Sequence, residues 1–133
     1  MPMGNRFLLF FTMIFLHIID DFYLQGILIN LKQKSWWKEQ TDDKLYKNDY
    51  KIALLIHGFS WSFTITLPYL IISLTTDNDI LTYMLIATYI LNTIAHAYID
   101  HTKANKRMIN LIVDQLLHMF QILMTWILIM STL

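Results

Sequence analysis

Four long apolar stretches, separated by short polar segments, constrain the fold of this chain more than any other feature of its sequence. A helix needs about 20 predominantly apolar residues to cross a bilayer, so the chain has room for four such helices. We expect these spans at about residues 7–31, 52–74, 80–99 and 108–131. The sequence therefore predicts an all-α membrane protein, a single integral domain over residues 1–133 that forms a bundle of four transmembrane helices.

The composition supports a membrane protein and excludes several other classes. Hydrophobic residues make up 56% of the 133 residues and charged residues only 15%, and a soluble domain of this length could not bury so much apolar surface. The formal net charge is zero, so no global field favours nucleic acid. The chain has no cysteine, which excludes disulfides and thiolate metal ligands. The first apolar stretch is longer than a signal-peptide core and lacks a small-residue cleavage site, so we interpret it as a retained span.

Basic residues predict the orientation of the chain. Nine of its ten lysines and arginines lie in the first and third links: Lys32, Lys34, Lys38, Lys44, Lys47, Lys51, Lys103, Lys106 and Arg107. The second link contains Asp77 and Asp79 and no basic residue. By the positive-inside rule, the two basic links face the cytoplasm, and both termini and the acidic loop lie outside. We expect the polar cytoplasmic link between the first two spans, residues 32–51, to be a surface helix or loop.

Histidines and aspartates recur in the expected spans at helical spacing. Three spans carry pairs four residues apart, and the other carries a single histidine: His17 with Asp21, His57, His96 with Asp100, and Asp114 with His118. Residues four apart lie on one face of a helix. The predicted topology places all seven in the cytoplasmic half of the bundle. Ionisable residues inside a membrane are costly, so this cluster needs a compensating function.

A metal site is the simplest way to compensate the charge of this cluster. Its three aspartates bring three negative charges into a low-dielectric bundle, and such carboxylates either take up protons or recruit cations. One or two divalent ions would bring the charge close to zero. Imidazole and carboxylate ligands without thiolate suit zinc, manganese or iron. Asp20 points about 100° away from Asp21 on an α-helix, so we choose Asp21 as the ligand.

With two ions bound, these ligands suggest water activation at a phosphoester or a similar centre. An aspartate that the metal does not fully engage would act as general base, and the candidates are Asp21, Asp100 and Asp114. Further polar side chains next to the ligands are expected to support them or to bind substrate: Gln25, Lys103 and Gln115. Lys103 lies at the inner rim, where it could hold an anionic group. The alternative for any single pair is an interhelical hydrogen bond of about 1 kcal/mol.

The same motifs resemble a family of small bacterial and phage inner-membrane proteins of unknown function. The family pattern H-x-x-x-D-F-x-L-Q reads His17 to Gln25 here, H-x-x-x-D-x-x-K reads His96 to Lys103, and D-Q-x-x-H reads Asp114 to His118. The chain departs from that pattern directly after Gln25. The resemblance implies a bacterial inner-membrane location and a likeness to small membrane proteins described as metal-dependent hydrolases. The H-x-x-x-D pairs are similar in style to those of zinc-dependent phospholipase C and related nucleases.

Three functional hypotheses follow. The leading one is a metal-dependent hydrolase that acts on a phosphorylated lipid, or a phosphorylated small molecule, from the cytoplasmic leaflet of the bilayer. The second is an ion or proton transporter that uses the same residues as a relay, although the outer halves of the spans carry no ionisable residue to continue a path. The third is a non-enzymatic phage or prophage accessory protein. Four short helices leave limited surface to enclose a site, so a homodimer is also compatible with the sequence.

Overall fold

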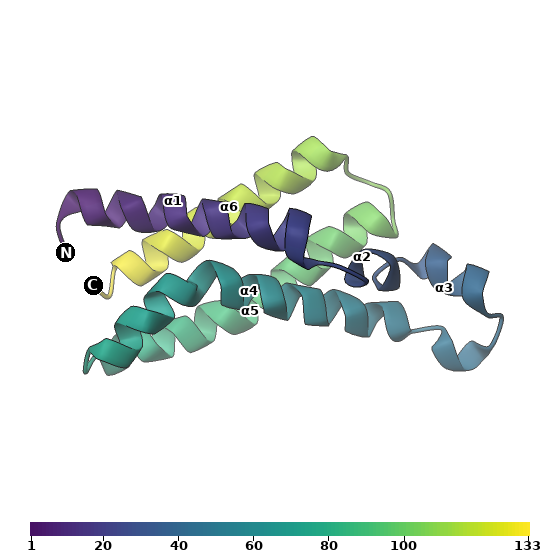
Figure 1. Ribbon diagram of the computed structural model, residues 1–133, viewed down its shortest axis with the longest axis horizontal. Helices are drawn as coiled ribbons and strands as arrows, with labels where there is room; N and C mark the ends of the chain where they lie inside the picture. The colour runs from purple at the N-terminus through teal and green to yellow at the C-terminus, as the bar shows by residue number, and fades with distance from the viewer.

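The computed structural model describes all 133 residues, and its regular structure is entirely helical (Figure 1). Four segments are long and apolar enough to cross a membrane: Met3–Leu24, Lys44–Thr75, Asp79–Ala104 and Leu111–Met130. The predicted all-α bundle with four transmembrane helices is confirmed. The chain is therefore a multi-pass membrane protein.

The four long helices form a ring in which each helix packs against two neighbours. The helices are α1 (Met3–Ile19), α4 (Asp49–Thr75), α5 (Asp79–Ala104) and α6 (Leu111–Met130). Helix α4 contacts α1 and α5, and α6 contacts α5 and α1. Both chain termini lie at the same end of the bundle, while the link between α1 and α4 extends from the opposite end (Figure 1).

The first long helix ends earlier than its apolar pattern predicts. We expected a span to residue 31, but α1 continues only through a π-helical segment, η1 (Asp20–Leu24). Gly26 then adopts a φ of +52°, which is left-handed backbone that glycine tolerates best and that ends the helix. The apolar residues that follow form a separate turn, α2 (Leu28–Leu31).

The polar link is a chain of short helices, in agreement with the expected surface helix or loop. After α2 come α3 (Lys34–Gln40) and a 3₁₀ turn, η2 (Lys44–Tyr46). The N–H of Lys34 donates to Oδ1 of Asn105 at 2.6 Å, and Nδ2 of Asn105 donates to the carbonyl of Lys32 at 3.0 Å. These two hydrogen bonds attach the link to the end of α5.

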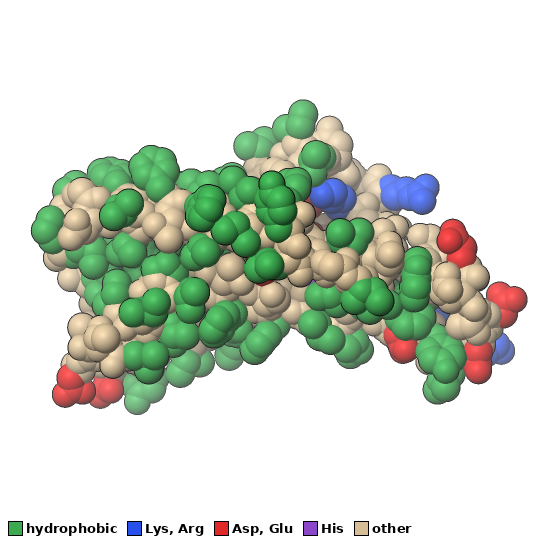
Figure 2. All heavy atoms as spheres, viewed as in Figure 1, with side chains coloured by type: hydrophobic (Ala, Val, Ile, Leu, Met, Phe, Trp, Pro, Cys, Tyr) green, Lys and Arg blue, Asp and Glu red, His purple; other side chains and the backbone are tan.

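Apolar side chains form most of the core in one half of the bundle and cover most of its outer surface. The buried core cluster consists of Met13, Trp61, Ile65, Tyr69, Leu81, Leu85, Ile122, Ile129 and Met130. Hydrophobic side chains also spread over the outside along most of the long axis, and charged side chains gather towards the ends (Figure 2). An apolar exterior of this kind is what a bilayer requires, because lipid replaces water as the solvent.

Helices α4 and α5 approach most closely at Gly58. A Cβ atom at this position would lie 2.6 Å from the carbonyl oxygen of Thr93 and 3.4 Å from the backbone nitrogen of Ala97. Both contacts are backbone atoms of α5, so no flexible side chain could move aside. Only glycine permits this distance between the two helices.

We predict that Gly58→Ala destabilises the protein by about 1 to 3 kcal/mol, because the added methyl group forces α4 and α5 apart. Thermal unfolding in detergent measures the effect. Gly4→Ala is the matched control, since no atom lies within 4 Å of a Cβ at that position. An unchanged melting temperature for Gly58→Ala would show that the helices are not in close contact there.

Candidate metal centre

The seven histidines and aspartates expected to form a site lie together at one level of the bundle, and each long helix contributes to it. Contacts shorter than 4 Å link all of them: His17, Asp21, His57, His96, Asp100, Asp114 and His118. The four histidine side chains are at most 1% exposed. The residues that are spaced four apart on separate helices therefore form one buried cluster in the structure.

Three of these side chains form a first ligand group. Nε2 of His57 lies 3.1 Å from Nε2 of His96, and Oδ1 of Asp21 lies 3.3 Å and 3.6 Å from these two atoms. Ligands bound to one tetrahedral zinc ion at about 2.0–2.1 Å are about 3.4 Å apart. The three donor atoms thus have the mutual distances of ligands that share one ion.

A second group shares His96 with the first and adds Asp100 and His118. Nε2 of His118 lies 3.5 Å from Oδ1 of Asp100. The other oxygen of Asp100 lies 3.5 Å from Nε2 of His57, so this carboxylate faces both groups. The arrangement can accommodate one ion, or two ions bridged by Asp100 at the separation of about 3.5–4 Å that two-metal sites have.

Several buried donor and acceptor atoms in the cluster have no hydrogen-bond partner. They include both ring nitrogens of His118, Nδ1 of His96 and Oδ1 of Asp114. A buried polar atom without a partner costs about 1–3 kcal/mol. A cation in the second group would supply a partner for Nε2 of His118, so the donor set fits a metal.

His17 is placed beside the ligand groups and not within them. The indole Nε1–H of Trp61 donates to Nδ1 of His17 at 2.7 Å. Since that nitrogen accepts, the His17 proton is on Nε2, which lies 3.1 Å from Oε1 of Gln115. Both ring nitrogens are therefore engaged. His17 orients Gln115, whose amide nitrogen lies 3.1 Å from Oδ2 of Asp114 and 3.4 Å from Oδ2 of Asp21.

Trp61 also forms an aromatic wall behind the ligands. Its ring stacks on His96 with centroids 4.3 Å apart, and His96 stacks on His118 at 4.2 Å. Trp61 is fully buried. The spacing of the sequence does not predict a role for Trp61, because a tryptophan inside an apolar run carries no signal of its own.

Asp20 belongs to the cluster as well, which α-helical spacing did not predict. Its Oδ1 accepts hydrogen bonds from the hydroxyls of Ser60 at 2.9 Å and Thr64 at 3.0 Å. Its Oδ2 lies 3.7 Å from Nδ1 of His57. The π-helical turn widens the helix at this point, so that Asp20 and Asp21 both face α4. Asp21 is in a ligand group, while Asp20 faces the far nitrogen of His57, a position that carboxylates take behind metal-bound histidines.

Two lysines contact the carboxylates from the polar end. Lys103 Nζ lies 2.6 Å from Oδ2 of Asp114, and Lys32 Nζ lies 2.6 Å from Oδ2 of Asp100. Sequence reasoning selected Lys103 but missed Lys32, which the link brings back towards the bundle. The four aspartates and two lysines leave a formal charge of minus two when the histidines are neutral. One divalent ion would neutralise it.

A cavity of about 350 Å³ leads from the cluster to the polar end of the bundle. It is lined by Asp21, Gln25, Ile29, Lys32, Gln33, Asp100, Lys103 and Ala104. Gln25 donates to the carbonyl group of Asp21, which fixes the end of the first helix beside this opening. The candidate ligands Asp21 and Asp100 are therefore accessible from the side of the basic link.

Comparisons with known proteins identify no relative of this chain. No protein-family profile, no curated protein and no solved structure matches the chain. The family membership expected from the three motifs stays a prediction.

We predict that Ser60→Ala combined with Thr64→Val destabilises the protein by about 1–3 kcal/mol, because the buried carboxylate of Asp20 loses both hydroxyl donors. Thermal unfolding in detergent provides the measurement. Thr102→Val is the control, since its hydroxyl bonds only to a carbonyl of its own helix at an exposed position. Equal stability of the double variant and the control would remove Asp20 from the supporting network.

Proposed function

We propose that this protein is a membrane-embedded, metal-dependent hydrolase that acts on a phosphorylated lipid or another anionic phosphate ester. The observation that carries the proposal is the first ligand group. Its three donor atoms, on Asp21, His57 and His96, are 3.1–3.6 Å apart and lie beside a cavity that opens to the polar end. The donor set suits one or two ions of zinc, manganese or iron.

The residues around the ligand groups have separate roles in this proposal. A divalent ion supplies an activated water and polarises the phosphate when it is bound. Asp114 lies outside both ligand groups, and its Oδ1 has no hydrogen-bond partner, so it is our candidate for the general base. Asp20 and Gln115 hold His57 and the aspartates in position.

The substrate class follows from the cavity. Its walls carry the ammonium groups of Lys32 and Lys103 above the two aspartates Asp21 and Asp100. Ammonium groups form charge-assisted hydrogen bonds with phosphate oxygens, and the cavity size of about 350 Å³ lies within the range of small-ligand pockets. The cavity opens at the polar end of the bundle, and lipid headgroups lie at the level of the polar ends of membrane-spanning helices.

The apolar half of the bundle favours a closed site over a transport path. Met13, Ile65, Leu81 and Ile122 are all fully buried on the side of the cluster away from the basic link. The buried polar groups in this layer, such as Asn92, Gln121 and Thr125, are neutral and hydrogen-bond to one another. A proton relay would need ionisable groups or water through the layer. The packing therefore supports hydrolysis at a site that is open at one end.

The proposal includes an orientation in the bacterial inner membrane. The basic links that flank the cavity face the cytoplasm by the positive-inside rule, and both termini lie outside. The site then opens towards the cytoplasmic leaflet. The acidic turn between α4 and α5 lies on the outer side.

We expect purified protein to carry one or two transition-metal ions per chain, measured by elemental mass spectrometry. His96→Ala and Asp100→Asn remove ligands and should weaken metal binding by more than about 100-fold, since even supporting residues contribute about 10- to 100-fold. His101→Ala is the control, because His101 lies outside both ligand groups. Folded wild-type protein that stays metal-free after incubation with zinc, manganese and iron salts would overturn the metal site.

The same preparations test hydrolysis. Phosphate release from a phosphorylated lipid in mixed micelles should stop on chelation and return with added metal. Asp114→Asn should lower kcat by about 10²- to 10⁴-fold, the contribution of a general base, while its metal content stays at the wild-type level. Full metal occupancy with no turnover on phosphorylated lipids or soluble phosphate esters would refute the hydrolase and keep the metal site.

Single cysteines test the orientation, because the natural chain has none. In intact bacterial cells, a membrane-impermeant maleimide should label Asn78→Cys in the acidic turn and leave Lys38→Cys in the basic link unlabelled. Both should react after the cells are opened. The reverse pattern would place the basic links outside.

A further inference from the structure

A second polar cavity lies outside the bundle, in the link between α2 and α4. Its volume is about 550 Å³. We call it the lysine pocket, and it is lined by Lys34, Trp37, Lys38, Thr41, Asp42, Asp43, Lys44, Tyr46 and Lys47. None of these residues lines the cavity of the metal cluster. The lysine pocket is therefore separate from the proposed hydrolase site.

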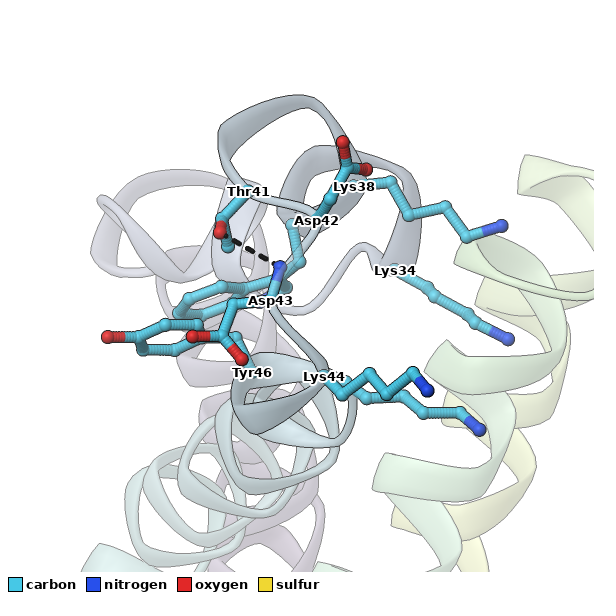
Figure 3. A pocket seen from close by; sticks show the side chains of 9 residues that line it. Lys34, Lys38, Thr41, Asp42, Asp43, Lys44 and Tyr46 are labelled. Atoms are coloured by element: carbon cyan, nitrogen blue, oxygen red, sulfur yellow. Dashed lines mark hydrogen bonds between the residues drawn. The ribbon is translucent and has the colours of Figure 1, made fainter.

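Four lysines line this pocket without carboxylate partners. The ion pairs between lysine and aspartate in the molecule involve Lys32 and Lys103 only. Figure 3 shows the side chains of Lys34, Lys38 and Lys44 extending towards the same side. The carboxylate of Asp43 lies on the other side of the pocket in this view. Asp42 and Asp43 also line the pocket, but neither forms an ion pair with these lysines. Neighbouring ammonium groups without an ion-pair partner repel one another, and an anion bound among them would relieve that repulsion.

The frame of the pocket is held by contacts that do not involve the ammonium groups. The rings of Trp37 and Tyr46 stack with centroids 6.1 Å apart and planes inclined by 8°. Trp37 Nε1 donates to the carbonyl of Leu31 at 2.7 Å. Oδ1 of Asp43 accepts from the N–H of Leu45 at 2.9 Å, which uses this carboxylate as a helix cap. The pocket is thus formed in advance, while its lysines remain free to bind.

The position of the pocket identifies its ligand. Helix α4 begins at Asp49, two residues after Lys47, and it enters the apolar span within about one turn. Tryptophans such as Trp36 and Trp37 are typical of the membrane interface. The lysines are exposed and directly precede an apolar span, and clustered lysines next to a span attract anionic lipids.

We propose that the lysine pocket binds the phosphate headgroup of an anionic phospholipid. Lys34, Lys38 and Lys44 contact the phosphate oxygens, and Trp37 packs below them. The acyl chains extend along the apolar surface of the adjoining helices. This binding anchors the link at the membrane surface and is independent of the metal-dependent reaction.

Native mass spectrometry of the full-length protein in detergent tests this proposal. Phosphatidylglycerol should bind at least about 10-fold more tightly than phosphatidylcholine with the same acyl chains. The triple variant Lys34→Gln, Lys38→Gln, Lys44→Gln should lose about 100-fold in phosphatidylglycerol affinity, because each lysine near an anionic headgroup contributes a factor of about five. All three side chains are exposed, so folding and metal content should not change.

The matched control is Lys51→Gln, Lys106→Gln, Arg107→Gln, which removes the same charge from exposed positions outside the pocket. It should retain most of the phosphatidylglycerol affinity. Equal losses in the two triple variants would show diffuse attraction and overturn a defined pocket. Displacement of phosphatidylglycerol by inorganic phosphate at matched concentration would identify a soluble phosphate ligand and overturn the lipid assignment.

Discussion

The close approach of α4 and α5 at Gly58 determines the geometry of the whole cluster. His57 precedes this glycine, while His96 lies between Thr93 and Ala97, the two residues whose backbone atoms Gly58 approaches. The contact between the helix backbones brings the Nε2 atoms of the two histidines to 3.1 Å. Helices α1 and α6 then add carboxylate and imidazole groups around a pair that is already placed. A wider separation would leave the same residues on the same faces but too far apart to share an ion.

Charge compensation explains why the two halves of the bundle differ. Four aspartates buried among helices carry a large desolvation cost, which lysines and a cation can offset only where links and water are close. The cluster accordingly lies near the end that carries Lys32 and Lys103, and the other half packs apolar side chains with neutral polar ones such as Asn92 and Gln121. The separation of an ionisable half from a neutral half is thus a result of electrostatics in a low dielectric.

The helix count and the seven clustered residues could be predicted, because apolar length and four-residue spacing depend only on helix geometry. Spacing could not predict Asp20, since a π-helical turn changes the direction of two consecutive side chains. It could not predict Lys32 either, because that contact depends on how Gly26 and the link fold back to the bundle. Four-residue spacing also predicted His17 as a ligand. In the structure, a hydrogen bond from Trp61 engages Nδ1 of His17, and Nε2 faces Gln115. These differences all arise from contacts between elements.

The lysines at the polar end of the molecule fall into two groups, those that pair with a buried carboxylate and those that do not. Lys32 and Lys103 each lie 2.6 Å from a buried carboxylate, and their first role is to compensate charge that the fold itself creates. The lysines of the link have no such partner, so their charge is available to a ligand from outside. A phosphate that entered the cavity beside the cluster would compete with Asp100 and Asp114 for the ammonium groups. A phosphate in the lysine pocket meets no such competition. The proposed lipid anchoring and the proposed substrate exchange would thus use two different lysine environments.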